Sequence, residues 1–144
     1  MTTTSPSWPG DSRSRVTSAR VARFGTVRPD GRPHLVPVTF ALADDTVVTA
    51  VDHKPKSTTA LQRLANIAAD PRVTLLVDHY DEDWQQLWWV RLDGTAHVVA
   101  TDDDERAGCV ELLAAKYADY RERPPAGPAV IIRVQTVVCW SAAD

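Results

Sequence analysis

The 144-residue sequence has few cysteines, few lysines and no long apolar segment. Its two cysteines, Cys109 and Cys139, are too few for a disulfide framework and match no zinc-ligand spacing, so we expect reduced thiols. No apolar run approaches the length of a membrane span, and the first residues lack the apolar core of a signal peptide. These absences lead us to expect a cytoplasmic protein that is not inserted in a membrane.

Lysines make up only three of the sixteen cationic residues, and the chain has a net charge of −3. Cations and anions are mixed along the sequence, without the basic blocks that are typical of proteins that bind nucleic acids or membrane surfaces. We therefore expect neither kind of partner. Two of the three lysines, Lys54 and Lys56, fall within one short stretch.

That stretch joins a predicted strand to a predicted helix. Residues 46–51 are apolar and rich in β-branched side chains, and residues 57–69 place apolar side chains at helical spacing. A hydroxyl at the start of the helix can cap it, and the free N–H groups and positive dipole end favour an anion there. Lys54 and Lys56 add two positive charges just before that end. The combination predicts a phosphate-binding turn; the alternative is an ordinary solvated turn.

The rest of the chain reads mainly as antiparallel strands joined by hairpins. Pro37 points to an edge strand or a bulge, and Gly94 suggests a bulge inside a long strand. The predicted strands cover residues 24–27, 34–42, 46–51, 72–77, 87–99 and 129–140, and the predicted helices cover residues 12–22, 57–69 and 102–120. We therefore expect a mostly β fold, an antiparallel barrel of about six strands with helices on its rim. Residues 1–10 are expected to be a disordered tail and residues 11–144 a single domain.

Several motifs occur in an order that is typical of one superfamily. They are residues 22–34 with an Asp-Gly-Arg-Pro-His hairpin, the proline-interrupted strand 36–40, the Lys-Pro-Lys-Ser stretch 54–57, residues 66–77 and residues 88–94. Over residues 19–140 the chain resembles the FMN-binding-like split β-barrel flavin and deazaflavin oxidoreductases related to pyridoxamine 5′-phosphate oxidase. It most resembles the branch that uses the deazaflavin coenzyme F420.

The resemblance implies a homodimer whose cofactor lies in a groove between the subunits. It assigns the cofactor phosphate to the turn before the second helix, and the ring system to two neighbouring strands. The matching positions are Lys54, Lys56, Ser57 and Thr58 for the phosphate, Thr49, Ala50, Val51, Pro37, Val38 and Thr39 for the ring, and Trp89 and Arg91 for ring and tail contacts. Because Trp88 and Trp89 alternate across their strand, one ring should face the core and the other the groove or the dimer surface.

The implied activity is hydride transfer from reduced F420 to an unidentified small organic acceptor, with the chemistry supplied by the cofactor. No catalytic side chain is therefore nominated. The alternatives are an FMN-binding oxidoreductase, a carrier that binds F420 without turnover and a haem-binding relative of the same barrel. The basic C-terminal motif of the pyridoxamine phosphate oxidases is not evident, which argues against vitamin B6 oxidation. His79 and the aspartates near it match neither a zinc nor a calcium pattern, so no metal site is expected.

Overall fold

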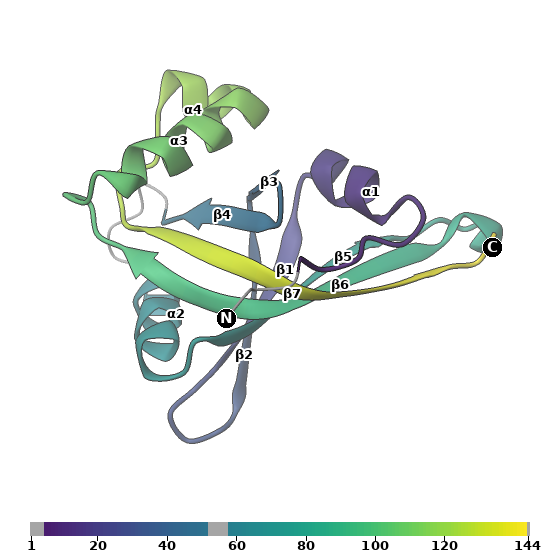
Figure 1. The fold of residues 1–144 in the computed structure, drawn as a ribbon, viewed down its shortest axis with the longest axis horizontal. Coiled ribbons are helices and arrows are strands. Elements are labelled where there is room, and N and C mark those ends of the chain that lie inside the picture. The colour runs from purple at the N-terminus through teal and green to yellow at the C-terminus, as the bar shows by residue number, and fades with distance from the viewer. Residues whose placement is uncertain (1–4, 52–57, 144) are drawn as a thin grey trace.

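The computed structural model describes residues 5–51 and 58–143, which form a strongly curled antiparallel sheet with helices around it (Figure 1). The strands within these residues are β1 Ala22–Val27, β2 Pro33–Val38, β3 Ala41–Ala43, β4 Thr46–Ala50, β5 Arg72–His79, β6 Trp88–Val99 and β7 Ala129–Ser141. They form one seven-stranded sheet in the order β2-β1-β5-β6-β7-β4-β3. β2 and β3 are consecutive in the chain but lie at opposite edges. The sheet therefore curls into a split barrel whose edges meet at the β2–β3 corner, formed by Thr39 and Phe40.

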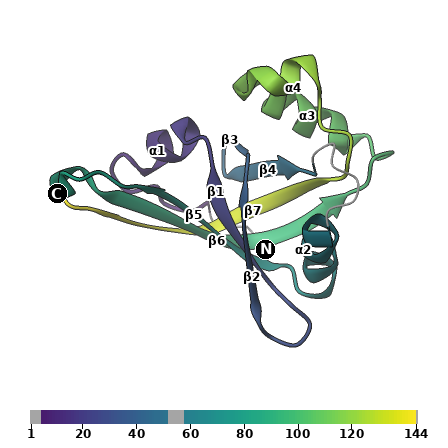
Figure 2. The ribbon, with the colours of Figure 1, turned by 180° about the vertical axis from the view of Figure 1, so that it is seen from behind.

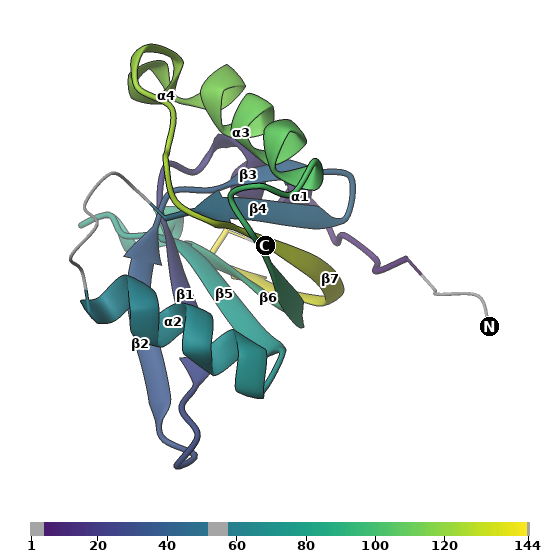
Figure 3. The same ribbon diagram turned by 90° about the vertical axis from the view of Figure 1, so that its left-hand side faces the viewer.

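Helices cover both faces of this sheet. Their bounds in the described residues are α1 Ser12–Ser18, α2 Thr58–Ala69, α3 Glu105–Lys116 and α4 Ala118–Glu122, with a 3-10 turn, η1, at Trp84–Gln86. α2 and α3 lie on opposite sides of the sheet (Figure 3). Val16 of α1 and Ile67 of α2 join the main core on the inner face, whereas Leu113 of α3 packs in a second cluster over β4. None of the described helices is long and apolar enough to cross a bilayer.

The expected fold class, a mostly β split barrel with rim helices, is confirmed, but the expected number of six strands is wrong. The strand predicted over residues 34–42 is two strands, and the break lies at the β2–β3 corner rather than at Pro37. Pro37 remains within β2, which is an edge strand and therefore tolerates a residue without an N–H. The corner is held by distant residues: Thr49 donates to the Thr39 carbonyl at 2.7 Å, and the Phe40 N–H donates to the Tyr117 hydroxyl at 3.2 Å.

Two predicted helices are shorter than expected. The helix predicted over residues 12–22 ends at Ser18, because Ala19 is extended (ψ 143°) and Ala22 already begins the alternating burial of β1. The helix predicted over residues 102–120 is divided at Tyr117, which has an extended backbone (φ −114°, ψ 120°). The bulge expected at Gly94 is confirmed, since the register of β6 against β7 shifts between Asp93 and Gly94.

The segment before α1 contacts the body of the domain through Trp8. Its indole N–H donates to Asp45 at 2.7 Å, and the guanidinium carbon of Arg13 lies 4.5 Å from its ring centroid. Trp8 also packs against the main core. This part of the expected tail is therefore bound along the β3–β4 turn.

Candidate functional site

The two segments predicted to line a cofactor ring lie next to each other. The buried Thr49 hydroxyl of β4 donates to the carbonyl oxygen of Thr39 at 2.7 Å. The Thr39 hydroxyl in turn lies 2.7 Å from the hydroxyl of Tyr120 in α4. The structure thus joins Thr39 and Thr49 directly and adds Tyr120, which the sequence pattern did not single out.

Not every residue predicted to contact the cofactor ring has its side chain exposed beside Thr39 and Thr49. Val38 belongs to the main core and Ala50 to the cluster under α3, so both side chains are packed within the protein. Pro37 is exposed on β2. Val38 and Ala50 can therefore reach a ligand through their main chain, and Pro37 and Thr39 through their side chains.

The strand that leads to the predicted phosphate turn is fixed at its end. Val51 donates its N–H to the Pro128 carbonyl at 2.9 Å and accepts from the Gly127 N–H at 3.2 Å. A β-carbon on Gly127 would lie 2.8 Å from the Val51 β-carbon, so this close approach requires glycine. Arg106 of α3 donates to the carbonyls of Gly127 and Pro125 at 2.9 and 2.6 Å. Val51 is therefore anchored to α3 through this loop.

Most of the residues predicted to bind the cofactor phosphate lie outside the described residues. Lys54, Lys56 and Ser57 lie outside the described residues, and so does the side chain of Thr58. The backbone of Thr58 begins α2, one residue after the predicted start of the helix.

A buried cation lies in the second turn of α2. Arg63 is 8% exposed, and its Nε has no hydrogen-bond partner in the described part of the chain. Burial lowers the pKa of its guanidinium, and Tyr120 opposes this shift. An unpaired buried charge is costly unless an anion binds beside it. Sequence patterns do not single out Arg63, because an arginine on an amphipathic helix usually marks the solvated side.

A polar layer lies between α2 and the β1–β2 hairpin. Asn66 donates to the Thr26 hydroxyl at 3.0 Å and accepts from Gln62 at 2.7 Å. His34 of β2 is also buried there, and its pKa is lowered by burial and then by Arg28 and Arg63. The lowered pKa favours the neutral form of His34, so Arg63 is the buried cation of this layer.

Trp89 and Arg91 lie on a different part of the sheet. Trp89 pairs with Trp140 across β6 and β7, and Arg91 is 3.2 Å from the carboxylate of Asp93. Trp88 packs against the main core. The alternation expected of the two tryptophans is therefore confirmed, with Trp88 on the inner face and Trp89 on the outer face.

The predicted site is thus divided into two groups within one chain. Thr49 is aligned with Val98 of β6 through Val130, and Trp89 lies nine residues earlier on β6. At about 3.4 Å per residue, the two positions are about 30 Å apart along the strand. Figure 2 shows this arm of β5, β6 and β7 extending away from α3 and α4. Among the described residues, no group of three or more histidines, cysteines and acids is placed to hold a metal ion.

Similar folds occur in solved structures of several bacterial proteins. The conserved hypothetical protein Rv2991 from Mycobacterium tuberculosis has a TM-score of 0.72 at 21% identity, with 99% of this chain and 91% of that chain covered. A FAD-binding protein from Mesorhizobium loti has a TM-score of 0.67 at 17% identity, covering 88% and 89%. A heme binding protein from Mycobacterium smegmatis has a TM-score of 0.69 at 20% identity, covering 96% and 60%. At these identities the likeness shows the fold alone.

Sequence comparison gives the family. No curated protein matches the sequence. A family model described as pyridoxamine 5′-phosphate oxidase, by contrast, matches residues 10–141, which is nearly the whole chain. The match includes every strand and helix described above, together with both groups of predicted site residues. The chain therefore belongs to the pyridoxamine 5′-phosphate oxidase family.

Proposed function

We propose that this protein is an oxidoreductase that binds coenzyme F420 and passes hydride from it to a small organic acceptor. Its family membership supports a cofactor-dependent redox role. When bound, the reduced deazaflavin ring supplies the hydride, and the protein binds and orients it. F420 also carries a phosphodiester and several carboxylates in its tail, so a site that binds it is expected to contain cationic side chains.

The main support for this proposal is the buried guanidinium of Arg63. Its guanidinium is buried, has no acceptor for Nε among the described residues, and lies within electrostatic reach of Tyr120, the partner of Thr39. A bound phosphate near the start of α2 would receive a charge-assisted hydrogen bond from Arg63 and satisfy the free N–H groups of the first turn. Lys54 and Lys56 are expected to contribute further positive charge.

The division of the site supports a homodimer. The outer face of the sheet has apolar side chains from four strands, and we call it the outer apolar face: Leu35, Leu76, Trp89, Val138 and Trp140. None of these side chains belongs to the two core clusters of the described chain, which include residues of α1, α2 and α3. A second copy on this face would bring its own Trp89 and Arg91 toward the Thr39 and α2 group of the first. We place this dimer in the cytoplasm, as the cysteine content led us to expect.

The test is a pair of titrations of the purified protein, one with F420 and one with FMN, followed by tryptophan fluorescence. Quenching is expected with F420. Arg63→Gln is expected to weaken F420 binding by about tenfold to a hundredfold, the usual worth of a hydrogen bond to a charged group. Its melting temperature should stay the same or rise, because an unpaired buried charge is removed. The matched control is Arg72→Gln, since Arg72 is exposed and paired with Asp70 at 2.8 Å.

The results of these titrations distinguish an F420-binding protein from an FMN-binding one. Quenching by FMN instead of F420 would establish the FMN-binding alternative, and full F420 affinity in Arg63→Gln would remove Arg63 from the site. Lys56→Ala is expected to weaken binding as well. Turnover with a panel of quinones and enones then separates a reductase from a carrier, because a carrier binds F420 without oxidising it.

A further inference from the structure

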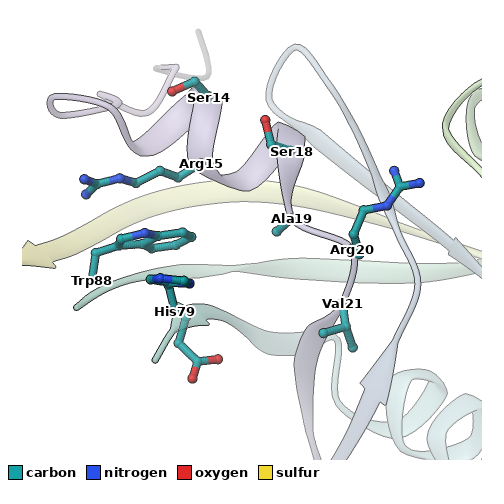
Figure 4. Close-up of a pocket in the computed structure, with 9 residues that line it drawn as sticks. Ser14, Arg15, Ser18, Ala19, Arg20, Val21, His79 and Trp88 are labelled. Carbon is teal, nitrogen blue, oxygen red and sulfur yellow. The ribbon is translucent and has the colours of Figure 1, made fainter. Parts of the chain in front are cut away.

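A hollow lies between α1 and the far end of the β5–β6 hairpin, and neither Arg63 nor Tyr120 lines it. It has a volume of about 390 Å³, within the range of small-molecule sites. Figure 4 shows side chains of α1 on one side and those of β5 and β6 on the other. Residues that line it include Arg15, Ser18, Ala19, Val21, His79 and Trp88.

The central feature of this hollow is a stack of three side chains. The guanidinium carbon of Arg15 lies 5.1 Å from the centroid of Trp88, and the ring of His79 stacks on Trp88 with centroids 5.9 Å apart and planes 19° apart (Figure 4). A guanidinium is planar and carries its N–H donors at its rim, so contact with an aromatic ring leaves donors available to another group. Those donors match the two oxygens of a carboxylate.

The donors of Arg15 are available, in contrast to those of Arg13 on the same helix. Arg13 also stacks on a tryptophan, Trp8, but it donates to the Asp45 carboxylate at 2.9 Å and to the Asp44 carbonyl at 2.7 Å. In the described residues, the Arg15 side chain has the ring contact with Trp88 but neither an ion pair nor a hydrogen bond.

The other ionisable groups of the hollow already have partners. Asp78 lies 3.7 Å from Arg23, and His79 lies 3.9 Å from Asp81. The guanidinium of Arg20 turns away to the ring of Tyr117, at 4.9 Å, and donates to the Lys116 carbonyl at 3.3 Å. Arg15 is therefore the cation that this hollow offers to a ligand.

We propose that this hollow binds a small planar carboxylate. The carboxylate accepts the rim donors of Arg15, and the apolar body of the ligand lies against Ala19, Val21 and the edge of Trp88. The hydroxyl of Ser18 provides a further polar contact at the wall. Because none of these residues belongs to the F420 site proposed above, this inference does not depend on that function.

The experiment uses the full chain and 2-naphthoate as the probe, without any cofactor. Calorimetry is expected to show binding, and the indole N–H signal of Trp88, assigned with Trp88→Phe, should shift in proton–nitrogen spectra. Arg15→Gln is expected to weaken binding at least tenfold, and Arg15→Lys should recover part of it. Arg13→Gln, which removes the same charge from the same helix, should bind 2-naphthoate as the unchanged protein does.

A second arm needs no variant and therefore cannot fail through misfolding. The alcohol 2-naphthylmethanol has the same ring system without the charge, and it is expected to bind at least tenfold more weakly than 2-naphthoate. Equal binding of the acid and the alcohol, equal binding by folded Arg15→Gln, or no shift of the Trp88 signal would each overturn the proposal.

A third arm identifies the source of the carboxylate. If a free organic acid occupies the hollow, saturating F420 leaves the 2-naphthoate affinity unchanged. If the carboxylate tail of the coenzyme reaches the hollow, F420 competes with 2-naphthoate, whereas a deazaflavin without the tail does not. Either result is compatible with carboxylate binding at Arg15, and the first two arms decide whether that binding exists.

Discussion

Gly94 is the residue at which the two longest strands change register. A β-carbon there would lie 3.0 Å from the carbonyl carbon of Arg133 and would overlap its oxygen. Gly94→Ala is expected to lower the free energy of unfolding by about 1–3 kcal/mol, as overpacking does in well-packed interiors. Gly108→Ala is the control: no atom lies within 4 Å of its β-carbon, so the helix should gain about 0.8–1.0 kcal/mol. Urea unfolding of both variants measures this difference, and equal effects would contradict it.

Lys116 makes the stability of the protein depend on pH in the alkaline range. Its ammonium lies 3.9 Å from the Phe40 centroid with no hydrogen-bond partner in the described residues, and burial and Arg20 lower its pKa from 10.5 to about 8. Between these two pH values the unfolded chain binds more protons than the folded chain, so the free energy of unfolding rises with pH. Below pH 8 the cost of the buried charge is fully present.

Lys116→Met should abolish this contribution. The variant is expected to be relatively more stable at pH 7 than at pH 10 when each value is compared with the unchanged protein at the same pH. Urea unfolding at the two pH values measures the difference, and all other titrating groups cancel in the comparison. Two parallel stability curves would show that Lys116 keeps its ordinary pKa.

At the scale of elements, Tyr117 connects the end of α3 to the opposite edges of the sheet. Its hydroxyl accepts from the Phe40 N–H at 3.2 Å and lies 2.9 Å from the Arg20 carbonyl. Tyr117→Phe leaves the buried N–H of Phe40 without its partner, which should cost about 1–3 kcal/mol of unfolding free energy. Tyr80→Phe should have almost no effect, because Tyr80 is exposed. A loss in Tyr117→Phe as small as in this control would show that the β2–β3 corner does not need the bond.

The contact between Tyr117 and Phe40 also illustrates which elements can be predicted from sequence and which cannot. Strands with period-two alternation and the bulge at Gly94 follow from local pattern, and they were predicted nearly at their bounds. The division of two predicted elements, at Thr39 and at Tyr117, follows from contacts between residues about 77 positions apart. No local pattern in a single sequence contains that information, so one strand and one helix were predicted where the chain has two of each.

The candidate site shows a similar limit. Adjacent positions on one strand, such as Thr49 and Ala50, were predicted to line the cofactor ring from the resemblance alone, and that assignment remains a prediction. Arg63 and Tyr120 could not be predicted in this way, because their importance arises from burial and from neighbours on other elements. A useful signal would be a cation on the apolar side of a helix, and Arg63 is four residues before Ile67 of α2, which belongs to the main core.

At the scale of the whole molecule, the outer apolar face of the sheet lies outside the core clusters of the described chain. Leu76 lies near its centre, paired with Arg23 on β1 and Arg91 on β6. Leu76→Glu should be tolerated by a single chain, since both arginines can pair with the new carboxylate. In a dimer formed through the outer apolar face, the same charge would be buried, so dissociation is expected. Trp89 and Arg91 would then be about 24–30 Å along the strand from the position aligned with Thr49 of the same chain, so the affinity for F420 should also fall.

Analytical ultracentrifugation and F420 titration of the same samples measure these two losses together. Leu112→Glu is the matched control, because Leu112 is a similarly placed leucine on the surface of α3, 37% exposed and outside the outer apolar face. It should remain dimeric and bind F420 normally. A Leu76→Glu protein that is monomeric yet binds F420 with full affinity would show that one chain forms the site by itself. A protein that stays dimeric would place the interface on another surface.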